Sequence, residues 1–196
     1  EGCKSLADRT NFEILQDKTV LIIGANGLIG SFLSDFFCYL NDHYSYNMKI
    51  ILTSYSDAAK AVRVQRILHR KDVRYFSWDC SQRIDEENLD ESIEYVFFCA
   101  GYGQPAKFLE NAVKTTLINI VGLDSVLLFL KNKTTAGKLL FLSSSEIYGS
   151  PPPWEVPTPE SYIGSHCFGP RACYVASKVT GEVLCNEYNK LENLDV

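Results

Sequence analysis

The chain has 196 residues, of which 46% are hydrophobic and 22% are charged, and its formal net charge is −5. This composition indicates a folded soluble protein that is long enough for one sizeable core. The acidic balance argues against nucleic acid or an anionic membrane as a partner. No apolar stretch is expected to reach the roughly 20 residues that a membrane helix needs.

The seven cysteines contain no C-x-x-C pair, and their number is odd. Several lie in apolar runs, as Cys99 does, which favours reduced thiols in a cytoplasmic protein. The three histidines are far from one another and from any cysteine cluster, so no metal site is expected. The chain starts at Glu1, and no charged and then apolar leader follows, so no signal peptide is expected.

The first part of the chain alternates between predicted strands and helices. Residues 1–18 are mixed and polar and predict an N-terminal extension or a short helix. The apolar run 19–23 predicts a strand, and apolar side chains at helical spacing over 28–40 predict a helix. A second strand is expected at 48–53. An amphipathic pattern predicts a helix over 57–70.

The same alternation continues to the end of the chain. Strands are expected at 73–78, 95–100 and 139–143, with a long helix over 105–132 that is broken early and another over 171–190. Strands that alternate with helices form βαβ units, and strands that are apolar throughout are covered on both faces. The sequence therefore predicts an α/β fold with a doubly wound parallel sheet, a Rossmann fold, over residues 19–196.

Six of the seven prolines fall between Pro151 and Pro170. One interpretation is a linker to another domain. The favoured interpretation is a stiff loop over the strand ends, near the substrate. The chain ends at residues 193–196, where a sixth strand is expected to begin.

A glycine-rich turn follows the first predicted strand and opens the first helix. Such a turn brings the backbone and the helix N-terminus close to a pyrophosphate. Gly24 suits the tight turn, Gly27 the close approach and Gly30 the packing of helix on strand, although the spacing is G-x-x-G-x-x-G rather than G-x-G-x-x-G. No Gly-Lys-Ser/Thr follows, which argues against a P-loop. The turn predicts a dinucleotide site that also includes Asn26, Leu28 and Ile29.

The acidic residue that usually holds the ribose hydroxyls is missing after the second strand. Thr53 and Ser54 occupy this place, and Asp57 comes a few residues late. Arg63 and Arg66 follow and would either face a 2′-phosphate or lie on a solvated helix face. The sequence therefore leaves NAD and NADP open.

Asp79 and Cys80 follow the third predicted strand, where the edge of an adenine would be contacted. For Asp79, a cap or turn role is an equally good interpretation.

Tyr174 and Lys178 are four residues apart, so they lie on one face of the last predicted helix. An ordinary phenol has a pKa of about 10, and a neighbouring ammonium favours its phenolate form. Ser144 or Ser145, after the fifth strand, would share a substrate hydroxyl. Taken alone, Y-x-x-x-K is common on helix surfaces. Together with the glycine turn and the serines it predicts a base that acts on an alcohol beside a nicotinamide.

These motifs together resemble the extended short-chain dehydrogenase/reductase family of nucleotide-sugar epimerases, dehydratases and decarboxylases. The resemblance covers nearly the whole chain and implies that Ser144, Tyr174 and Lys178 are catalytic. It also implies an NAD cofactor, with NADP not excluded, and a nucleotide-activated sugar as substrate. The matching elements are the glycine turn, Cys99-Ala100-Gly101, Asn119-x-x-Gly122, Ser143-Ser144-Ser145-Glu146-Ile147-Tyr148-Gly149 and Tyr174-x-x-x-Lys178. Cys99, Ala100, Gly101, Asn119 and Ser143 thereby join Thr53, Ser54, Asp79 and Cys80 as expected cofactor contacts. Tyr174 and Lys178 are expected to contact the cofactor as well, with the lysine on a cofactor ribose.

Glu146 narrows the resemblance to the dehydratase and decarboxylase branches. Residues 169–174, Gly-Pro-Arg-Ala-Cys-Tyr, are most similar to UDP-glucuronate decarboxylases, whereas residues 175–178 differ from the Asp-Glu-Gly-Lys typical of those enzymes. The implied chemistry is a transient oxidation at the sugar C4, followed by loss of CO2 or water with Glu146 as acid or base. A solvated loop carboxylate is the alternative for Glu146.

Several alternatives remain open. A 4-epimerase and a net dehydrogenase use the same residues, and a non-catalytic dinucleotide sensor or scaffold would keep the fold alone. The resemblance also implies a homodimer through the helices near 105–131 and 171–190. It further implies a small C-terminal substrate-binding domain, which this sequence lacks.

Overall fold

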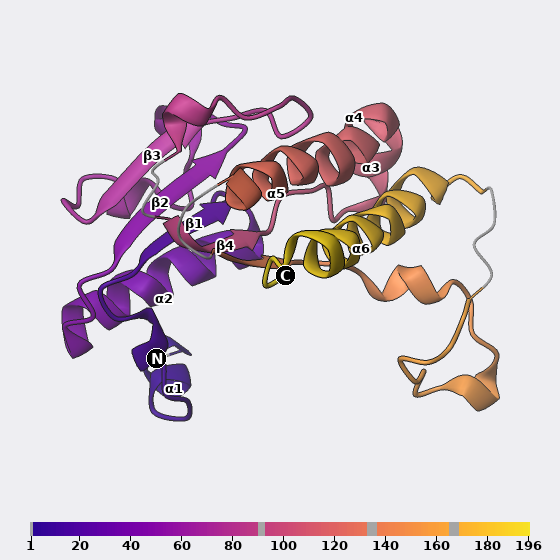
Figure 1. Ribbon diagram of the computed structural model, residues 1–196, viewed down its shortest axis with the longest axis horizontal. Helices are drawn as coiled ribbons and strands as arrows, with labels where there is room; N and C mark the ends of the chain where they lie inside the picture. The colour runs from indigo at the N-terminus through magenta and orange to yellow at the C-terminus, as the bar shows by residue number, and fades with distance from the viewer. Residues whose placement is uncertain (1, 90–92, 133–136, 165–168) are drawn as a thin grey trace.

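The computed structural model describes residues 2–89, 93–132, 137–164 and 169–196 (Figure 1). Five parallel strands form one sheet in the order β3-β2-β1-β4-β5. The strands are β1 (Thr19–Ile23), β2 (Lys49–Ser54), β3 (Val73–Ser77), β4 (Ile93–Phe98) and β5 (Lys138–Phe141). The chain runs outward from β1 to β3 and then returns to β4 on the other side of β1, which confirms the doubly wound Rossmann sheet.

Helices cover both faces of the sheet, as the apolar strands predict. Figure 1 shows α2 (Leu28–Tyr44) on one side of the strands and α5 (Leu123–Asn132) on the other. Alternate residues of β1 serve the two cores: Val20 and Ile22 belong to the cluster under α2, and Leu21 and Ile23 to the cluster under α5. All four are fully buried. The short α1 (Gly2–Ala7) packs beside α2.

The predicted helix over 57–70 is wrong. Residues 58–60 and 65–67 form short 3₁₀ turns instead. Successive backbone bonds join Val64 N to Ala61 O and Ile67 N to Val64 O. Ala61, Val64 and Ile67 are the buried residues of this segment. A burial period of three matches 3₁₀ geometry, in which residues i and i+3 lie one above the other.

The predicted long helix over 105–132 is broken early, as expected, into consecutive segments. These are α3 (Pro105–Glu110), α4 (Ala112–Leu117), a π-helical turn (Ile118–Gly122) and α5. The expectation that no stretch is long enough to span a membrane is wrong, because Ala112–Asn132 passes by length and composition. More than half of this stretch is buried inside the protein, which is typical of a core helix.

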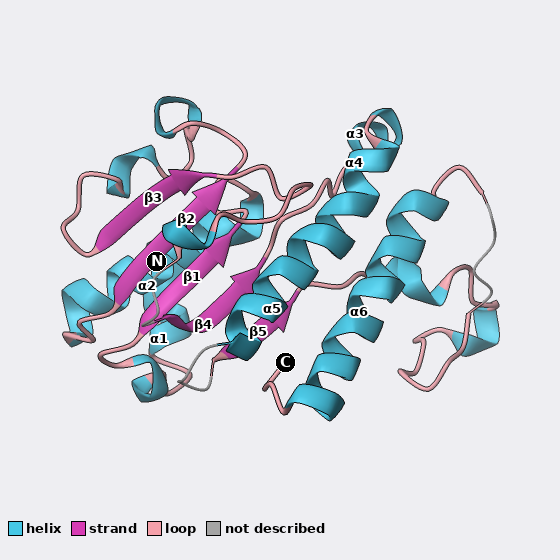
Figure 2. Ribbon diagram, turned by 45° about the horizontal axis from the view of Figure 1, so that its top comes forward, coloured by secondary structure: helices cyan, strands magenta, loops and turns pink. Residues whose placement is uncertain are grey.

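The last helix, α6 (Ala172–Glu192), packs along α4 and the π-helical turn (Figure 2). After it, the backbone N of Leu139 donates to the Asp195 oxygen at 2.9 Å, in a parallel bridge on the free edge of β5. The start of the expected sixth strand is therefore present as a single bridge.

The proline-rich segment does not lie over the strand ends. Figure 1 shows the described residues after β5 leading past α6 and away from the sheet, with short 3₁₀ turns at 145–148 and 153–155. The prolines there restrict φ and remove backbone donors, which suits a segment outside the sheet. His166 and Cys167 lie outside the described residues, so the expectations for them stay predictions.

Candidate functional site

The glycine turn joins β1 to α2 at the carboxyl end of the sheet. Gly24 has a φ of +84°, and a Cβ at this residue would lie 2.7 Å from the backbone N of Ala100, at the end of β4. A Cβ on the buried Gly30 would lie 2.4 Å from the Gly24 oxygen. Glycine at both positions therefore lets the turn lie between the ends of β1 and β4 with α2 close above it.

The N-terminus of α2 is open to an anion. No side chain caps it, and the backbone N of Ser31 donates to the Gly27 oxygen at 3.0 Å. The preceding N–H groups have no partner within the helix and carry the positive end of the helix dipole. These groups fit the pyrophosphate of a dinucleotide.

A cleft of about 320 Å³ opens beside this turn. Its lining comes from the glycine turn, the ends of β2, β3 and β4, and helices α3 and α4. The lining residues are Gly24, Asn26, Gly27, Ser54, Tyr55, Ser56, Asp79, Cys80, Cys99, Ala100, Gly101, Tyr102, Lys107, Lys114 and Ile118. Nine of the predicted cofactor residues thus share one cleft.

The other predicted cofactor residues lie elsewhere. Leu28 and Ile29 are exposed on the first turn of α2, whereas Gly30 and Thr53 are buried beneath the turn. Ser143 lines a different hollow between β5 and α6. Tyr174 and Lys178 lie on α6 and are not among the residues that line the cleft.

Asn119 is fully buried in the π-helical turn, away from the cleft lining. Its side-chain amide donates to the Ser177 hydroxyl at 2.9 Å. Asn119 therefore joins the α4–α5 region to α6, one residue before Lys178.

In the cleft, Asp79 is held in two ways. Its carboxylate accepts from Lys114 Nζ at 2.7 Å, and it also accepts from the N and Oγ of Ser81. Burial alone would raise the pKa of Asp79, but these bonds outweigh it and lower the pKa. The Lys114 ammonium also lies 3.8 Å from the ring centroid of Tyr55, so it joins α4 to the loop after β2. Asp79 thus has both the predicted turn role and a place in the cleft.

Hydroxyl groups occupy the end of β2. Ser54 Oγ lies 2.7 Å from the Tyr75 hydroxyl, which in turn donates to the Ser56 oxygen. The backbone N of Arg63 donates to Asn26 Oδ1 at 3.0 Å, which holds the segment after β2 against the glycine turn. Arg66 instead forms an ion pair with Asp35 of α2.

Lys178 is buried, and its amine donates to the Leu142 oxygen at 2.6 Å. An ideal Cβ position at Gly101 lies 4.0 Å from Lys178 Nζ, so the amine stands directly behind the cleft wall. Burial lowers the pKa of Lys178 to about 8. Burial also raises the pKa of the neighbouring Cys99 thiol to about 12, so this thiol is neutral at pH 7 and brings no charge to the lysine.

Tyr174 begins the same helix face one turn before Lys178. Its ring stacks on Phe108 of α3, with 4.7 Å between ring centroids and 8° between planes. Arg171, just before α6, forms an ion pair with Glu146, and its guanidinium lies 5.5 Å from the Phe108 ring centroid. The sequence-predicted Glu146 is therefore brought to the start of α6.

Ser144 lies at the end of β5 and caps the short turn that carries Glu146. Its Oγ accepts from the backbone N of Glu146 at 3.3 Å. A hydroxyl that accepts this bond keeps its own proton free to donate to a substrate oxygen.

Sequence reasoning missed Tyr55, Lys107, Lys114, Phe108 and Arg171. The sequence offers one signal for Lys114, which lies on the same helical run as Asn119. It offers one for Arg171, which lies three residues before Tyr174. Phe108 carries no sequence signal, because an apolar residue on a helix predicts only core. The described residues contain no group of three His, Cys, Asp or Glu side chains that could hold a metal ion.

Comparison with known proteins supports the family that the sequence motifs resemble. The model of the NAD dependent epimerase/dehydratase family matches residues 20–196. UDP-glucuronic acid decarboxylase 1 of Xenopus tropicalis is 28% identical over 181 residues, covering 91% of this chain and 39% of that protein. UDP-glucuronic acid decarboxylase 5 of Arabidopsis thaliana is 28% identical over 178 residues, covering 90% of this chain and 48% of that protein. The chain spans less than half the length of these relatives.

Solved structures show the same fold. UDP-N-acetylglucosamine 4-epimerase from Methanobrevibacter ruminantium M1, in complex with UDP-N-acetylmuramic acid, superposes with a TM-score of 0.74 at 23% identity. It covers 92% of this chain and 53% of its own. The Bordetella bronchiseptica enzyme WbmF in complex with NAD+ gives a TM-score of 0.69 at 18% identity, covering 92% and 48%. With a family model that matches nearly its whole length, the chain belongs to the NAD-dependent epimerase/dehydratase family.

Proposed function

We propose that this chain is the cofactor-binding part of an NAD-dependent enzyme that acts on a nucleotide-activated sugar. The reaction is a transient oxidation at the sugar C4, followed by decarboxylation. The single observation that carries the proposal is the place of Lys178. Its buried amine stands behind the cleft wall at Gly101, on the same face of α6 as Tyr174.

The cleft residues fit a dinucleotide. The glycine turn and the uncapped α2 N-terminus suit the pyrophosphate, and Asp79 and Cys80 suit the adenine edge. Gly101 and Cys99 form the wall in front of Lys178, where a nicotinamide would lie. When bound, the cofactor supplies a hydride acceptor that returns the hydride at the end of the reaction.

The chain's own residues would handle the protons. Tyr174 takes the proton of the sugar hydroxyl, with Lys178 one turn later on the same face of α6. Ser144 donates a hydrogen bond to the same sugar oxygen. Ser144 follows β5 at the carboxyl end of the sheet, where open α/β sheets bind ligands, and Tyr174 and Lys178 lie on the first turns of α6.

Decarboxylation is favoured over dehydration or 4-epimerisation for two reasons. The curated relatives named above are UDP-glucuronic acid decarboxylases. In addition, Arg171 pairs with Glu146 beside Tyr174, so an arginine is available at this site for a sugar carboxylate. A ketone next to the carbon that bears the carboxylate makes loss of CO2 favourable, and Glu146 would serve the protonation that follows.

The test is turnover by the full-length protein. UDP-glucuronate is expected to give CO2 and a UDP-pentose, detected by mass spectrometry. Tyr174→Phe is expected to abolish this product. A 4-epimer of the substrate would instead indicate the epimerase, and accumulating NADH would indicate a net dehydrogenase. Unchanged turnover by Tyr174→Phe would contradict the role proposed for the phenol. No turnover of any nucleotide sugar would favour a non-catalytic sensor.

A homodimer through α4 and α6 is also proposed. Ile118 and Leu127 are buried in the core of the chain, so they cannot contact a second copy. Val113, Val183 and Leu109 are exposed apolar residues that could form the interface. Light scattering of Val183→Lys against the wild type tests this, with a shift to monomer expected.

A cytoplasmic location is favoured by the cysteines. The six cysteines within the described residues all carry free thiols, which suits a reducing compartment. Extraction under thiol-blocking conditions and mass analysis would test it.

A further inference from the structure

We infer that the adenosine end of the cleft accepts a dinucleotide with a 2′-phosphate as well as one with a free 2′-hydroxyl, and that Ser54 decides this. The inference rests on the proposed cofactor site and names the ribose group that the site takes. It concerns binding alone, so its test needs no turnover.

Ser54 stands where dinucleotide folds place an acid. It is the last residue of β2, and the preceding Thr53 oxygen accepts from the backbone N of both Gly24 and Ala25. Ser54 therefore lies beside the glycine turn, and it lines the cleft. A carboxylate here would accept bonds from ribose hydroxyls and repel a phosphate. A serine hydroxyl is uncharged, so it does not repel a phosphate and does not bind ribose hydroxyls as an anion.

The hydroxyl of Ser54 can also serve both kinds of ribose. The Tyr75 hydroxyl donates its proton to the Ser56 oxygen, so Ser54 donates to Tyr75 and its own oxygen can accept from a 2′-hydroxyl. If the Tyr75 proton turns toward Ser54, the Ser54 proton becomes free to donate to a phosphate oxygen. A carboxylate could not make this second arrangement.

The surrounding charges suit a phosphate. Lys107, Lys114 and Asp79 are the charged residues of the cleft lining, which leaves one positive charge in excess. Arg63 is bound through its backbone to Asn26 of the glycine turn, and its side chain is exposed. In the part of the chain that the structure describes, its guanidinium forms no ion pair.

Asp57 is the acid nearest along the chain, and it must be considered as a substitute. It is exposed at the start of the 58–60 turn and does not line the cleft. Asp57 is therefore expected to have no part in the choice between the two dinucleotides.

The experiment is isothermal titration of the purified chain with NAD+ and with NADP+. The wild type is expected to bind the two with dissociation constants within about tenfold of each other. Ser54→Asp is expected to weaken NADP+ binding by about 100-fold because two like charges are then opposed, and to leave NAD+ binding within about threefold of the wild type.

A second pair of variants tests the inference independently, in case a buried aspartate at position 54 disturbs folding. Arg63→Glu changes an exposed residue and is expected to weaken NADP+ binding about tenfold more than NAD+ binding. Lys71→Glu makes the same change of charge just before β3, at the amino end of the strands and away from the cleft, and should leave the ratio unchanged. Asp57→Asn should leave it unchanged as well.

Wild-type NADP+ binding more than about 100-fold weaker than NAD+ binding would overturn the inference. So would failure to bind either dinucleotide, a shift in the ratio by Asp57→Asn, or an unchanged ratio in both Ser54→Asp and Arg63→Glu. Failure of the proposed reaction is separate, because an inactive protein would still show these binding ratios.

Discussion

The ring of Phe108 lies face to face with the phenol of Tyr174, with 4.7 Å between the centroids and 8° between the planes. Phe108 is only 1% exposed, and its backbone oxygen accepts from the Cys173 thiol next to Tyr174. The short helix α3 therefore fixes the plane of the phenol on α6. Parallel ring contacts of this kind restrict a side chain beyond what burial alone does.

Phe108→Leu is expected to lower kcat for UDP-glucuronate by about 10- to 100-fold, since a small misplacement of a reacting group has an effect of this size. KM should change little, because Phe108 is packed behind Tyr174. Phe108→Tyr keeps the stacked ring and should restore most of the rate. Steady-state kinetics of the full-length protein provide the measurement.

Phe36→Leu on α2 is the matched control, because Phe36 is also 1% exposed. Both substitutions should lower the free energy of unfolding by about 1 to 3 kcal/mol. Only Phe108→Leu should lower kcat. Equal kcat values for the two variants would mean that Phe108 is a core residue with no effect on Tyr174.

The sequence was sufficient for the sheet and for the order of its strands, although the predicted strands 95–100 and 139–143 both end two residues later than β4 and β5. Apolar runs gave β1 without error, and the glycine turn marked the boundary between β1 and α2, because both signals are local. The segment 57–70 was misread because its buried residues 61, 64 and 67 fit a helical period nearly as well as a period of three.

Contacts between distant segments could not be predicted in the same way. The ion pair of Lys114 with Asp79 joins residues 35 apart, and the stack of Phe108 on Tyr174 joins α3 to α6. Y-x-x-x-K placed Tyr174 and Lys178 on one helix face, but the burial of Lys178 depends on β5 and on the end of β4. Such features require the fold before they can be seen.

Gly30 is expected to be intolerant of a side chain. In Gly30→Ala the Cβ would lie 2.4 Å from the backbone oxygen of Gly24, so α2 must move away from the turn. We expect a loss of about 1 to 3 kcal/mol in the free energy of unfolding, together with weaker NAD+ binding. Gly103→Ala is the control, because nothing lies within 4 Å of its Cβ position. If Gly30→Ala matches that control in both stability and binding, the close approach of α2 to the turn is unimportant.

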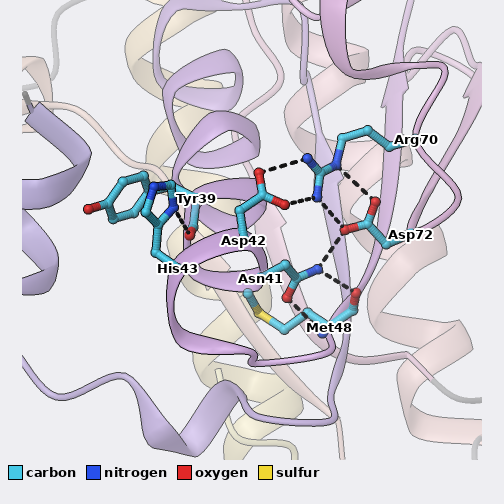
Figure 3. A network of polar contacts seen from close by, with 7 residues as sticks. All are labelled: Tyr39, Asn41, Asp42, His43, Met48, Arg70 and Asp72. Atoms are coloured by element: carbon cyan, nitrogen blue, oxygen red, sulfur yellow. Dashed lines mark hydrogen bonds and ion pairs between the residues drawn. The ribbon is translucent and has the colours of Figure 1, made fainter.

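Arg70 connects the start of β3 with the end of α2, far from the cleft (Figure 3). Its guanidinium donates to both oxygens of Asp42 and to Asp72, and Asn41 joins Asp72 to the backbone of Met48. Arg70→Met is expected to lower the free energy of unfolding by about 1 to 3 kcal/mol. NAD+ binding should stay unchanged, which separates this network from the site.

The same network gives a dependence on pH. Hydrogen bonds from Arg70 lower the pKa of Asp42 and of Asp72 below the ordinary carboxyl value of 3.8. The unfolded chain then binds more protons than the folded one in this range, so the contribution is complete above pH 3.8 and is lost as pH falls through the lowered values. Denaturation curves between pH 2.5 and about pH 6 should converge for wild type and Arg70→Met at the acid end. A difference in the free energy of unfolding that stays constant across this range would contradict the role of Arg70 in lowering these two pKa values.

Lys178 is expected to make the protein less stable at neutral pH. Burial lowers its pKa from 10.5 to about 8, so between these values the unfolded chain holds a proton that the folded chain has released. The free energy of unfolding therefore rises with pH over this range, and below pH 8 the folded state carries the full cost of a buried ammonium. Lys178→Met should be more stable than the wild type at pH 7 by about 1 to 3 kcal/mol, less what the bond to Leu142 contributes.

The stability gap between Lys178→Met and the wild type should shrink as pH rises from 8 to 10.5. Comparing the two proteins at each pH cancels the titration of the other groups, and urea denaturation supplies the free energies. Turnover should be lost in the variant, because it lacks the amine that stands behind the cleft wall at Gly101, where the nicotinamide is proposed to lie. If Lys178→Met is instead less stable than the wild type at pH 7, by an amount that does not change with pH, the lysine contributes to stability through packing. The expected result would show instead that the fold keeps a destabilising amine where the chemistry needs it.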